Sequence, residues 1–250
     1  MRPFRMIAVL LTAALLPFAG QAAEVQVAVA SNFTKPMQTI AERFERNTGH
    51  KVALAFGSTG KLYAQIRNGA PFEVLLAADD AVPAKLESGG LGVTGSRFSY
   101  AIGTLVLWSA RQDYIENQNA LVDQPYRHLA IASPKTAPYG AAAIATLEKL
   151  GLTESAQGRL VQGENIAQTH QFVASGNAEL GFVALSQVVD NGAIGQGSGW
   201  IVPSTYHPPI RQDALLLLKG HDNPAAKALL DFLKSEETAE VIEAYGYSLE

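Results

Sequence analysis

The chain has 250 residues, no cysteine and a formal charge of −4, with 19 Lys and Arg against 23 Asp and Glu. The absence of cysteine excludes disulfides, thiol chemistry and zinc sites built on cysteine. No cluster of basic residues occurs, so we expect no contact with nucleic acid, and the length suits two modest domains or one large one.

The first 23 residues are typical of a secretory signal peptide. Arg2 and Arg5 are basic, residues 6–19 are mostly apolar, and residues 20–23 include the small residues that a cleavage site needs. The alternative, a membrane anchor, needs a longer apolar run to span a bilayer comfortably. We therefore expect an exported chain, and removal of the two arginines with the signal takes its formal charge to −6.

Strand and helix patterns alternate in the first part of the mature chain. A helix with an apolar stripe at i, i+3, i+4 and i+7 follows the first strand and ends at Gly49. The order βαβαβα predicts a parallel sheet with helices on both faces. The expected strands are residues 25–30, 51–56 and 73–77, and the later helices are residues 59–68 and 81–88.

A long apolar stretch then covers residues 98–108, with Gly103 where it could bend. It leads through a polar segment, residues 111–124, into a second α/β unit. The glycine-rich residues 192–199 predict a loop. The unit's expected strands are residues 128–133, 159–162 and 179–183, and its expected helices are residues 139–150 and 165–175.

Another long apolar strand, residues 210–218, and two amphipathic helices, residues 223–235 and 236–245, finish the chain. Two long strands that flank the second unit indicate a chain that leaves one lobe, builds another and returns. The predicted fold is α/β with two lobes and a ligand cleft between them. One continuous doubly wound domain is the alternative, which loop lengths alone leave open. The predicted limits are residues 24–103 with 208–250 for lobe 1 and residues 104–207 for lobe 2.

Polar residues stand where four strands give way to helices. Backbone N–H groups at a helix start have no partner within the helix and form a natural seat for an anion. Because the chain is acidic, these local dipoles and not the net charge must attract such a ligand. The four turns are AVASNFTKPMQ (28–38), LAFGSTGKL (54–62), IASPKTAPYG (131–140) and VQGENIAQ (161–168).

The motifs of catalysis and metal binding are missing or misplaced. The five histidines are scattered, so a zinc site is not indicated. Residues 90–95 match GxGxxG but follow a helix instead of a strand. Asp79-Asp80 and Glu164 lie at helix starts, where a carboxylate usually caps the helix or faces its dipole. An enzyme, the rival class, would need a base paired with a nucleophile in the cleft; we expect no enzyme.

Taken together in this order, the four turns resemble those of the periplasmic molybdate-binding proteins of ABC importers, within the class of two-lobed substrate-binding proteins. The resemblance extends to QIRNGAPFEVLLAAD (65–79), YAIGTLVLWS (100–109) and GENIAQTHQFV (163–173). It implies a periplasmic binding protein fold with two crossover strands. It also implies a monomer in the periplasm, without a cofactor, that delivers molybdate or tungstate to an ABC permease and ATPase complex at the membrane. Another oxyanion, such as sulfate or thiosulfate, is the alternative.

The same resemblance implies which residues hold the ion. In that family neutral donors surround the tetrahedral dianion, and the metal itself has no protein ligand. The matching positions here are Ser31 and Asn32, Ser58, Tyr139 and the backbone N–H of Ile166. Some members also use a tyrosine near position 184, where this chain has alanine, so Tyr139 would supply the phenol.

Ordinary structural roles are the alternative for these positions. The two serines and Asn32 could be N-caps, and Tyr139 a half-buried aromatic at a helix start. Physical chemistry supports the ligand role, because a buried dianion without hydrogen bonds would cost many kcal/mol. Several donors must therefore converge on it from both lobes. Donors alone favour a fully deprotonated anion over hydrogen phosphate, whose proton needs an acceptor.

Overall fold

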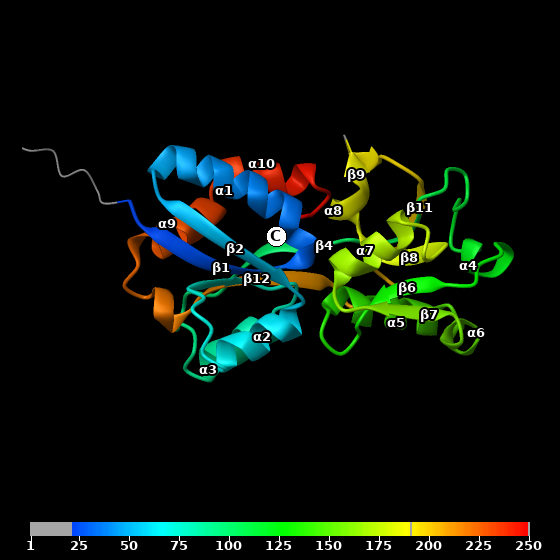
Figure 1. Cartoon of the computed structure of the whole chain (residues 1–250), viewed down its shortest axis with the longest axis horizontal. Helices are drawn as coiled ribbons and strands as arrows, with labels where there is room; N and C mark the ends of the chain where they lie inside the picture. Colours follow the sequence, from blue (N-terminus) through cyan, green and yellow to red (C-terminus); the bar gives the residue numbers. More distant parts are fainter. Residues whose placement is uncertain (1–21, 191, 250) are drawn as a thin grey trace, which may run out of the picture.

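The computed structural model describes residues 22–190 and 192–249, so residues 1–21 of the predicted signal peptide lie outside the described part. Its strands form two five-stranded sheets, ordered β2-β1-β3-β12-β4 and β11-β5-β8-β6-β7, and a short hairpin β10-β9. Figure 1 shows the two sheets in separate halves along the long axis of the molecule. The predicted two-lobed α/β architecture is therefore confirmed, and the alternative of one continuous sheet is wrong.

Lobe 1 is the half built on the first sheet. Three of its strands, β2, β1 and β3, are parallel as predicted, whereas β12 runs antiparallel to β3 and β4. Its strands are β1 (Glu24–Ala30), β2 (Lys51–Gly57), β3 (Val74–Leu76), β4 (Phe98–Gly103) and β12 (Ile210–Leu216). Its helices are η1 (Ser31–Phe33), α1 (Thr34–Thr48), α2 (Thr59–Arg67), α3 (Ala81–Ser88), η2 (Leu218–Gly220), α9 (Pro224–Leu233) and α10 (Glu236–Ala244).

Helices cover both faces of this sheet, which explains why β1 is apolar almost throughout. Val25, Val27 and Val29 pack in a cluster with residues of α1, α9 and α10, while Ala28 packs with residues of α2 and α3. Figure 1 shows these two groups of helices on opposite sides of β1 and β12. The first helix ends as predicted at Gly49, whose φ of 76° is left-handed and whose N–H donates to Glu45.

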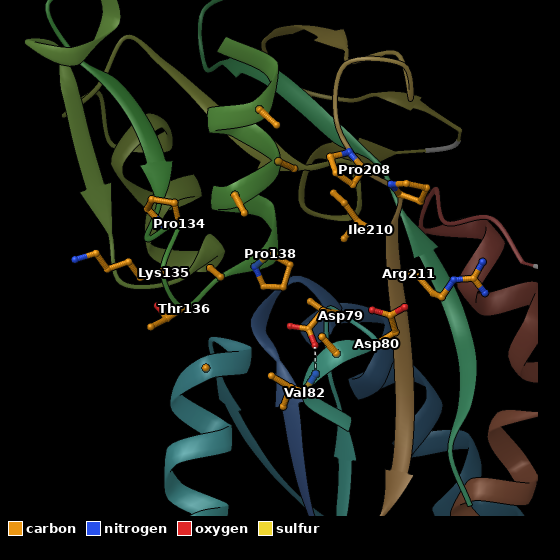
Figure 2. A pocket seen from close by; sticks show the side chains of 18 residues that line it. Asp79, Asp80, Val82, Pro134, Lys135, Thr136, Pro138, Pro208, Ile210 and Arg211 are labelled. Atoms are coloured by element: carbon orange, nitrogen blue, oxygen red, sulfur yellow. Dashed lines mark hydrogen bonds between the residues drawn. The ribbon is translucent and has the colours of Figure 1, made fainter. Parts of the chain in front are cut away.

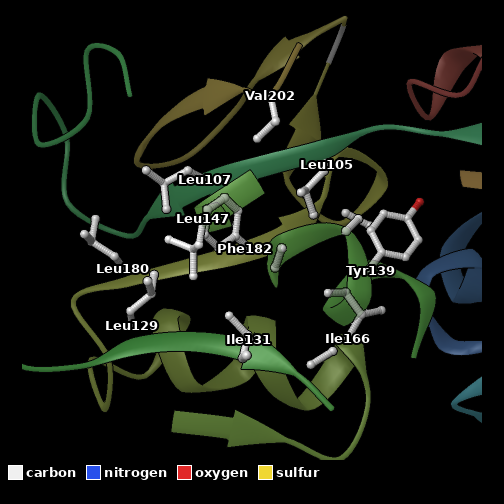
Figure 3. Packing of buried hydrophobic residues seen from close by; sticks show 14 of the residues in the cluster. Leu105, Leu107, Leu129, Ile131, Tyr139, Leu147, Ile166, Leu180, Phe182 and Val202 are labelled. Atoms are coloured by element: carbon white, nitrogen blue, oxygen red, sulfur yellow. The ribbon is translucent and has the colours of Figure 1, made fainter. Parts of the chain in front are cut away.

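Lobe 2 is the half built on the second sheet. Its cluster of buried side chains lies between the sheet and α5, and Tyr139 stands at the edge of that cluster with its hydroxyl pointing away from it (Figure 3). Its strands are β5 (Leu105–Ser109), β6 (Leu129–Ala132), β7 (Leu160–Gly163), β8 (Leu180–Ala184), β9 (Val189–Asp190), β10 (Ala193–Ile194) and β11 (Ser198–Ile201). Its helices are α4 (Ala120–Asp123), α5 (Pro138–Lys149), α6 (Thr153–Gln157), α7 (Ile166–Ala174) and α8 (Leu185–Val188).

The long apolar stretch 98–108 passes from one lobe to the other. It breaks at Thr104 into β4, which pairs with β12, and β5, which pairs with β8 in the second sheet. The chain returns to the first sheet at Ile210, where β12 begins. The residue limits of the two lobes given above stay a prediction.

One local expectation is wrong, and the short helix α6 was not predicted. Residues 192–199, predicted as a loop, contain β10 and the first residues of β11, which pairs with β5. Helix α6 is only five residues long, and such a short helix leaves no periodic signal in the sequence. Within the described residues, every helix is too short or too polar to cross a bilayer.

Candidate functional site

The four predicted turns meet at one small cavity between the lobes. Lobe 1 supplies Ser31 and Asn32 after β1 and Ser58 after β2, and lobe 2 supplies Tyr139 at the start of α5 and Ile166 at the start of α7. The structure thus brings together all five residues predicted for the site. The rest of the lining consists of uncharged residues, namely Ala30, Gly57, Thr59, Ala78, Ala137 and Pro138.

The size of the cavity restricts its occupant to something small. Its volume is about 10 Å³, which is roughly the space that one water needs, whereas sites for organic ligands span about 300–1,000 Å³. The residues that line the cavity are nearly buried, since Ser31 is 5%, Ser58 3%, Tyr139 2% and Ile166 3% exposed. A cavity of this size excludes a bulky organic ligand.

Ser58 presents a free hydroxyl to this cavity. It occupies the N-cap position of α2, yet its side chain accepts no capping hydrogen bond, so the N-cap alternative is wrong for its hydroxyl. Only two buried side-chain polar atoms of the described residues lack a partner, Ser58 Oγ and His207 Nε2. His207 is not part of the cavity lining. A buried hydroxyl without a partner costs free energy, so Ser58 Oγ indicates a ligand at this position.

The side chain of Asn32 lines the cavity but its amide group is engaged elsewhere. The amide nitrogen donates to Gln212 Oε1 at 2.8 Å and to the Tyr247 hydroxyl at 3.0 Å. These two bonds use both hydrogens of the amide group. The group that Asn32 can offer to an anion is therefore its backbone N–H, which lies in the first turn of η1.

Tyr139 carries a neutral phenol into the cavity. Burial, together with the neighbouring phenols of Tyr247 and Tyr100, raises the pKa of Tyr139 well above its usual value. Its oxygen accepts a hydrogen bond from Gln212 Nε2 at 3.3 Å. A phenol that stays protonated and already accepts one hydrogen bond can donate its own proton to an anion.

Ile166 begins α7, and the capping of this helix leaves its first N–H for the cavity. The side chain of Asn165 caps the helix by accepting from Gln168 N at 3.0 Å. The capping hydrogen bond thus uses the N–H of Gln168 and not that of Ile166. The start of a nine-residue helix also carries the positive end of its dipole, which stabilises negative charge at this wall of the cavity.

Sequence reasoning missed the layer of side chains behind the cavity. The Gln212 side chain forms hydrogen bonds with Asn32, with Tyr139 and with the Tyr100 hydroxyl, which donates to Gln212 Oε1 at 3.1 Å. On the other side, Ser186 Oγ donates to the Asn32 carbonyl at 2.8 Å. The signal that could have found this layer is the pair Gln212-Asp213, two polar residues in the otherwise apolar strand β12. Thr59 was missed too; its hydroxyl accepts from Ala78 N at 3.0 Å.

A larger groove beside the cavity, of about 400 Å³, does not suit an anion. Figure 2 shows the carboxylates of Asp79 and Asp80 pointing into it, while Lys135 and Arg211 extend away. Asp79 also caps the start of α3, because its Oδ1 accepts from Val82 N at 2.7 Å. Negative charge faces this groove, so the small uncharged cavity remains the candidate site. The described residues contain no group of three or more acidic, histidine or cysteine side chains that could hold a metal ion.

The position of Asp79 makes stability depend on pH. Burial, and then the carboxylates of Asp80 and Asp213, raises the pKa of Asp79 to about 6 from 3.8. Between these values the folded state binds more protons than the unfolded state, so this group's contribution to the free energy of unfolding falls as the pH rises. Above pH 6 the buried carboxylate is charged, and its destabilising effect on the folded state is fully present.

We expect Asp79→Asn to remove this penalty while keeping the acceptor for Val82 N. In urea unfolding, the variant should match the natural protein near pH 4 and exceed it by on the order of 2 kcal/mol at pH 7. A stability difference that does not change between pH 4 and 7 would show that Asp79 is not held in a destabilised charged state.

Comparison with known proteins gives a consistent result. The family model described as "Bacterial extracellular solute-binding protein" matches residues 25–248. The molybdate-binding protein ModA of Azotobacter vinelandii is 62% identical over 243 residues, which are 97% of this chain and 96% of that protein. ModA of Rhodobacter capsulatus is 49% identical and covers 94% of this chain and 92% of its own length. The solved periplasmic molybdate-binding protein of A. vinelandii superposes with a TM-score of 0.87 at 41% identity, over 90% of this chain and 99% of that one.

Proposed function

This chain belongs to the bacterial extracellular solute-binding proteins, and from that premise we propose that it binds molybdate or tungstate in the periplasm. It holds the ion between its two lobes and, as a monomer, delivers it to an ABC permease and ATPase complex. The observation that carries the proposal is the small, uncharged and nearly buried cavity that Ser31, Asn32, Ser58, Tyr139 and Ile166 line together. The proposal also agrees with the printed names of the relatives.

Hydrogen bonds can offset the cost of burying such an ion. A hydrogen bond to a charged group contributes about 1.5–3 kcal/mol, and a helix start adds about 0.3–1 kcal/mol, up to about 2 when partly buried. The hydroxyls of Ser31, Ser58 and Tyr139 and the N–H groups of Asn32 and Ile166 are the donors. Because they come from both lobes, capture of the ion and closure of the lobes are one event.

The donor set also selects the protonation state of the ligand. None of the side chains that line the cavity is a carboxylate or a histidine, and the raised pKa of Tyr139 keeps its phenol protonated. A site with donors but no strong acceptor favours an oxyanion that carries no proton at neutral pH. Molybdate, tungstate and sulfate meet this condition, whereas hydrogen phosphate does not.

A panel of oxyanions tests the function by thermal unfolding, because a ligand of the native state raises the melting temperature. At a hundredfold excess over Kd the stabilisation is about 2.7 kcal/mol, which corresponds to a rise of roughly 5–10 °C for a chain of this size. We expect this rise with molybdate and tungstate, and a smaller one with hydrogen phosphate. No rise with molybdate or tungstate, together with a rise for sulfate or thiosulfate, would reassign the ligand.

Contacts between the lobes support the closed state that this function requires. Gly60 N donates to Thr136 O at 2.9 Å, and the ammonium of Lys61 pairs with the carboxylate of Glu164. Glu164, interpreted from the sequence as a residue facing the helix dipole, thus also bridges the cleft. The pair is about half exposed on both sides, so its contribution to closure should be small.

We expect Lys61→Met to weaken molybdate binding by no more than about fivefold, since an exposed pair contributes only about 0.2–1 kcal/mol. Calorimetry at low and high salt should show that this difference disappears as salt screens the pair. Lys51→Met is the matched control, because Lys51 pairs with Glu45 within lobe 1. An equal loss of affinity in both variants would mean that Lys61 acts through the overall charge and not through the cleft.

A further inference from the structure

We propose that Gln212 is a positioning residue of this site, which directs the hydroxyl proton of Tyr139 toward the bound anion. The inference rests on the proposed function and identifies what makes the phenol a donor there. Gln212 lies on β12 in lobe 1, whereas Tyr139 lies on α5 in lobe 2. Their hydrogen bond therefore crosses between the lobes directly behind the cavity.

The orientation of the Gln212 amide is fixed by its neighbours. Its oxygen faces two donors, Asn32 Nδ2 at 2.8 Å and the Tyr100 hydroxyl at 3.1 Å. The side chain is completely buried, so no water can replace these partners. With its oxygen held on that side, the amide must present its N–H groups to Tyr139, whose oxygen lies 3.3 Å from Nε2.

This bond decides what the Tyr139 hydroxyl can do. Its oxygen accepts from Gln212, so its hydrogen must point to another acceptor. The neighbouring Tyr247 hydroxyl also forms a side-chain hydrogen bond with Tyr139. Its oxygen accepts from Asn32 Nδ2 at 3.0 Å, and it donates to the Asn32 carbonyl at 2.9 Å or to Ser186 Oγ at 3.0 Å, so it is a neutral competitor for the Tyr139 proton. An anion in the cavity is then the strongest acceptor within reach, since charged acceptors form stronger hydrogen bonds than neutral ones.

The backbone of β4 keeps the pair in place. A Cβ atom at Gly103 would overlap both the Tyr139 hydroxyl and Gln212 Nε2, so the two groups rest directly against this glycine.

Because its N–H orients the Tyr139 hydroxyl, Gln212 has a predicted effect on selectivity as well as on affinity. If its N–H were removed, the Tyr139 hydroxyl could turn and its oxygen could accept a hydrogen bond from the P–OH group of hydrogen phosphate.

A double-mutant cycle tests the inference by calorimetry with molybdate. We expect Tyr139→Phe to weaken binding by about tenfold or more, since it removes a charge-assisted hydrogen bond. Gln212→Met, which has a similar volume and no N–H, should weaken binding by about three- to tenfold. In the double variant the loss should equal that of Tyr139→Phe within about twofold, because residues that act through one another are not additive.

A second readout separates positioning from a merely structural role. Gln212→Met should lower the ratio of molybdate to hydrogen phosphate affinity by about tenfold, whereas a general loosening of the site would weaken both ions alike. Melting temperatures without ligand check the fold of each variant. If Gln212→Met does not fold, Gln212→Asn serves the same cycle, because its shorter amide stays polar but cannot reach Tyr139.

The outcomes distinguish this inference from the proposed function. If the natural protein binds no molybdate, the function and the inference both fail. If it binds molybdate but the losses from Gln212 and Tyr139 substitutions multiply, or the ratio to phosphate does not change, only the inference is overturned. A loss in the double variant equal to that of Tyr139→Phe, with a lowered ratio, supports it.

Discussion

Ser58→Ala is expected to weaken molybdate binding at least tenfold while leaving the ligand-free protein as stable as before, or slightly more so. The Ser58 hydroxyl is buried and has no hydrogen-bond partner within the protein. Its removal therefore breaks no internal hydrogen bond in the ligand-free protein. In the complex it removes a hydrogen bond to a charged ligand, and such a bond contributes about 1.5–3 kcal/mol. Calorimetry measures the affinity, and urea unfolding without ligand measures the stability.

Ser235→Ala is the matched control for this experiment. Ser235 also stands at an N-cap, that of α10, but its side chain does accept from Thr238 N at 3.3 Å. Loss of a working cap costs about 0.5–2 kcal/mol, so this variant should be less stable and bind molybdate normally. If Ser58→Ala behaved in the same way, Ser58 would be an ordinary helix cap.

Gly103→Ala should weaken molybdate binding by tenfold or more and also lower the melting temperature. The added methyl group would overlap the Tyr139 hydroxyl and Gln212 Nε2, and overpacking of this kind costs typically about 1–3 kcal/mol. The overlap with Tyr139 arises only when the lobes meet, so it disfavours closure, whereas the overlap with Gln212 lies within lobe 1 and lowers stability with or without ligand. Calorimetry and thermal unfolding with and without molybdate measure the two effects.

Two further variants make the Gly103 result interpretable. Gly158→Ala adds the same methyl group where no atom lies within 4 Å and φ is −76°, so binding should not change. In a Tyr139→Phe background, Gly103→Ala should lose less affinity than in the natural protein, since one of the overlapping atoms is gone. A loss of the same size in both backgrounds would place the effect of Gly103 elsewhere in β4.

The four turns that line the cavity could be predicted from the sequence, because a strand-to-helix turn is a local feature; the individual site residues were implied by the resemblance. A helix start fixes where its free N–H groups lie, and Ser31, Ser58 and Ile166 stand at strand-to-helix turns that can be recognised from neighbouring residues. The carboxyl ends of parallel strands meet at one edge of a sheet, which brings such turns together. The two-lobed fold followed from the alternation of strands and helices in two units.

The direction of the Asn32 side chain could not be predicted in this way. Its partners, Gln212 and Tyr247, lie 180 and 215 residues farther along the chain. A resemblance places Asn32 at the site, but only the packing of β12 and the C-terminal segment decides that its amide faces inward. The same holds for the hydroxyl of Tyr139, whose role depends on a strand of the other lobe.

The sequence pattern of β12 shows that polar groups are buried there, but not what each does. Gln212 and Asp213 are adjacent and both almost fully buried. Asp213 accepts from Arg97 Nη1 and from the Ser99 hydroxyl, both at 2.6 Å, and so holds β12 against the start of β4. The register of β12 against β4 shifts between these two residues, and such an irregularity redirects side chains in a way that the sequence pattern does not reveal.

The burial of the site residues between the lobes affects the kinetics of ligand exchange. With Ser58 and Tyr139 almost inaccessible to solvent, a second anion cannot approach until the lobes separate. A competing oxyanion, however concentrated, should therefore not speed the departure of the first, and the rate of displacement should be independent of competitor concentration. Turnover of cargo in this protein is then governed by how often the cleft opens, and a transporter that accelerates opening controls the moment of delivery.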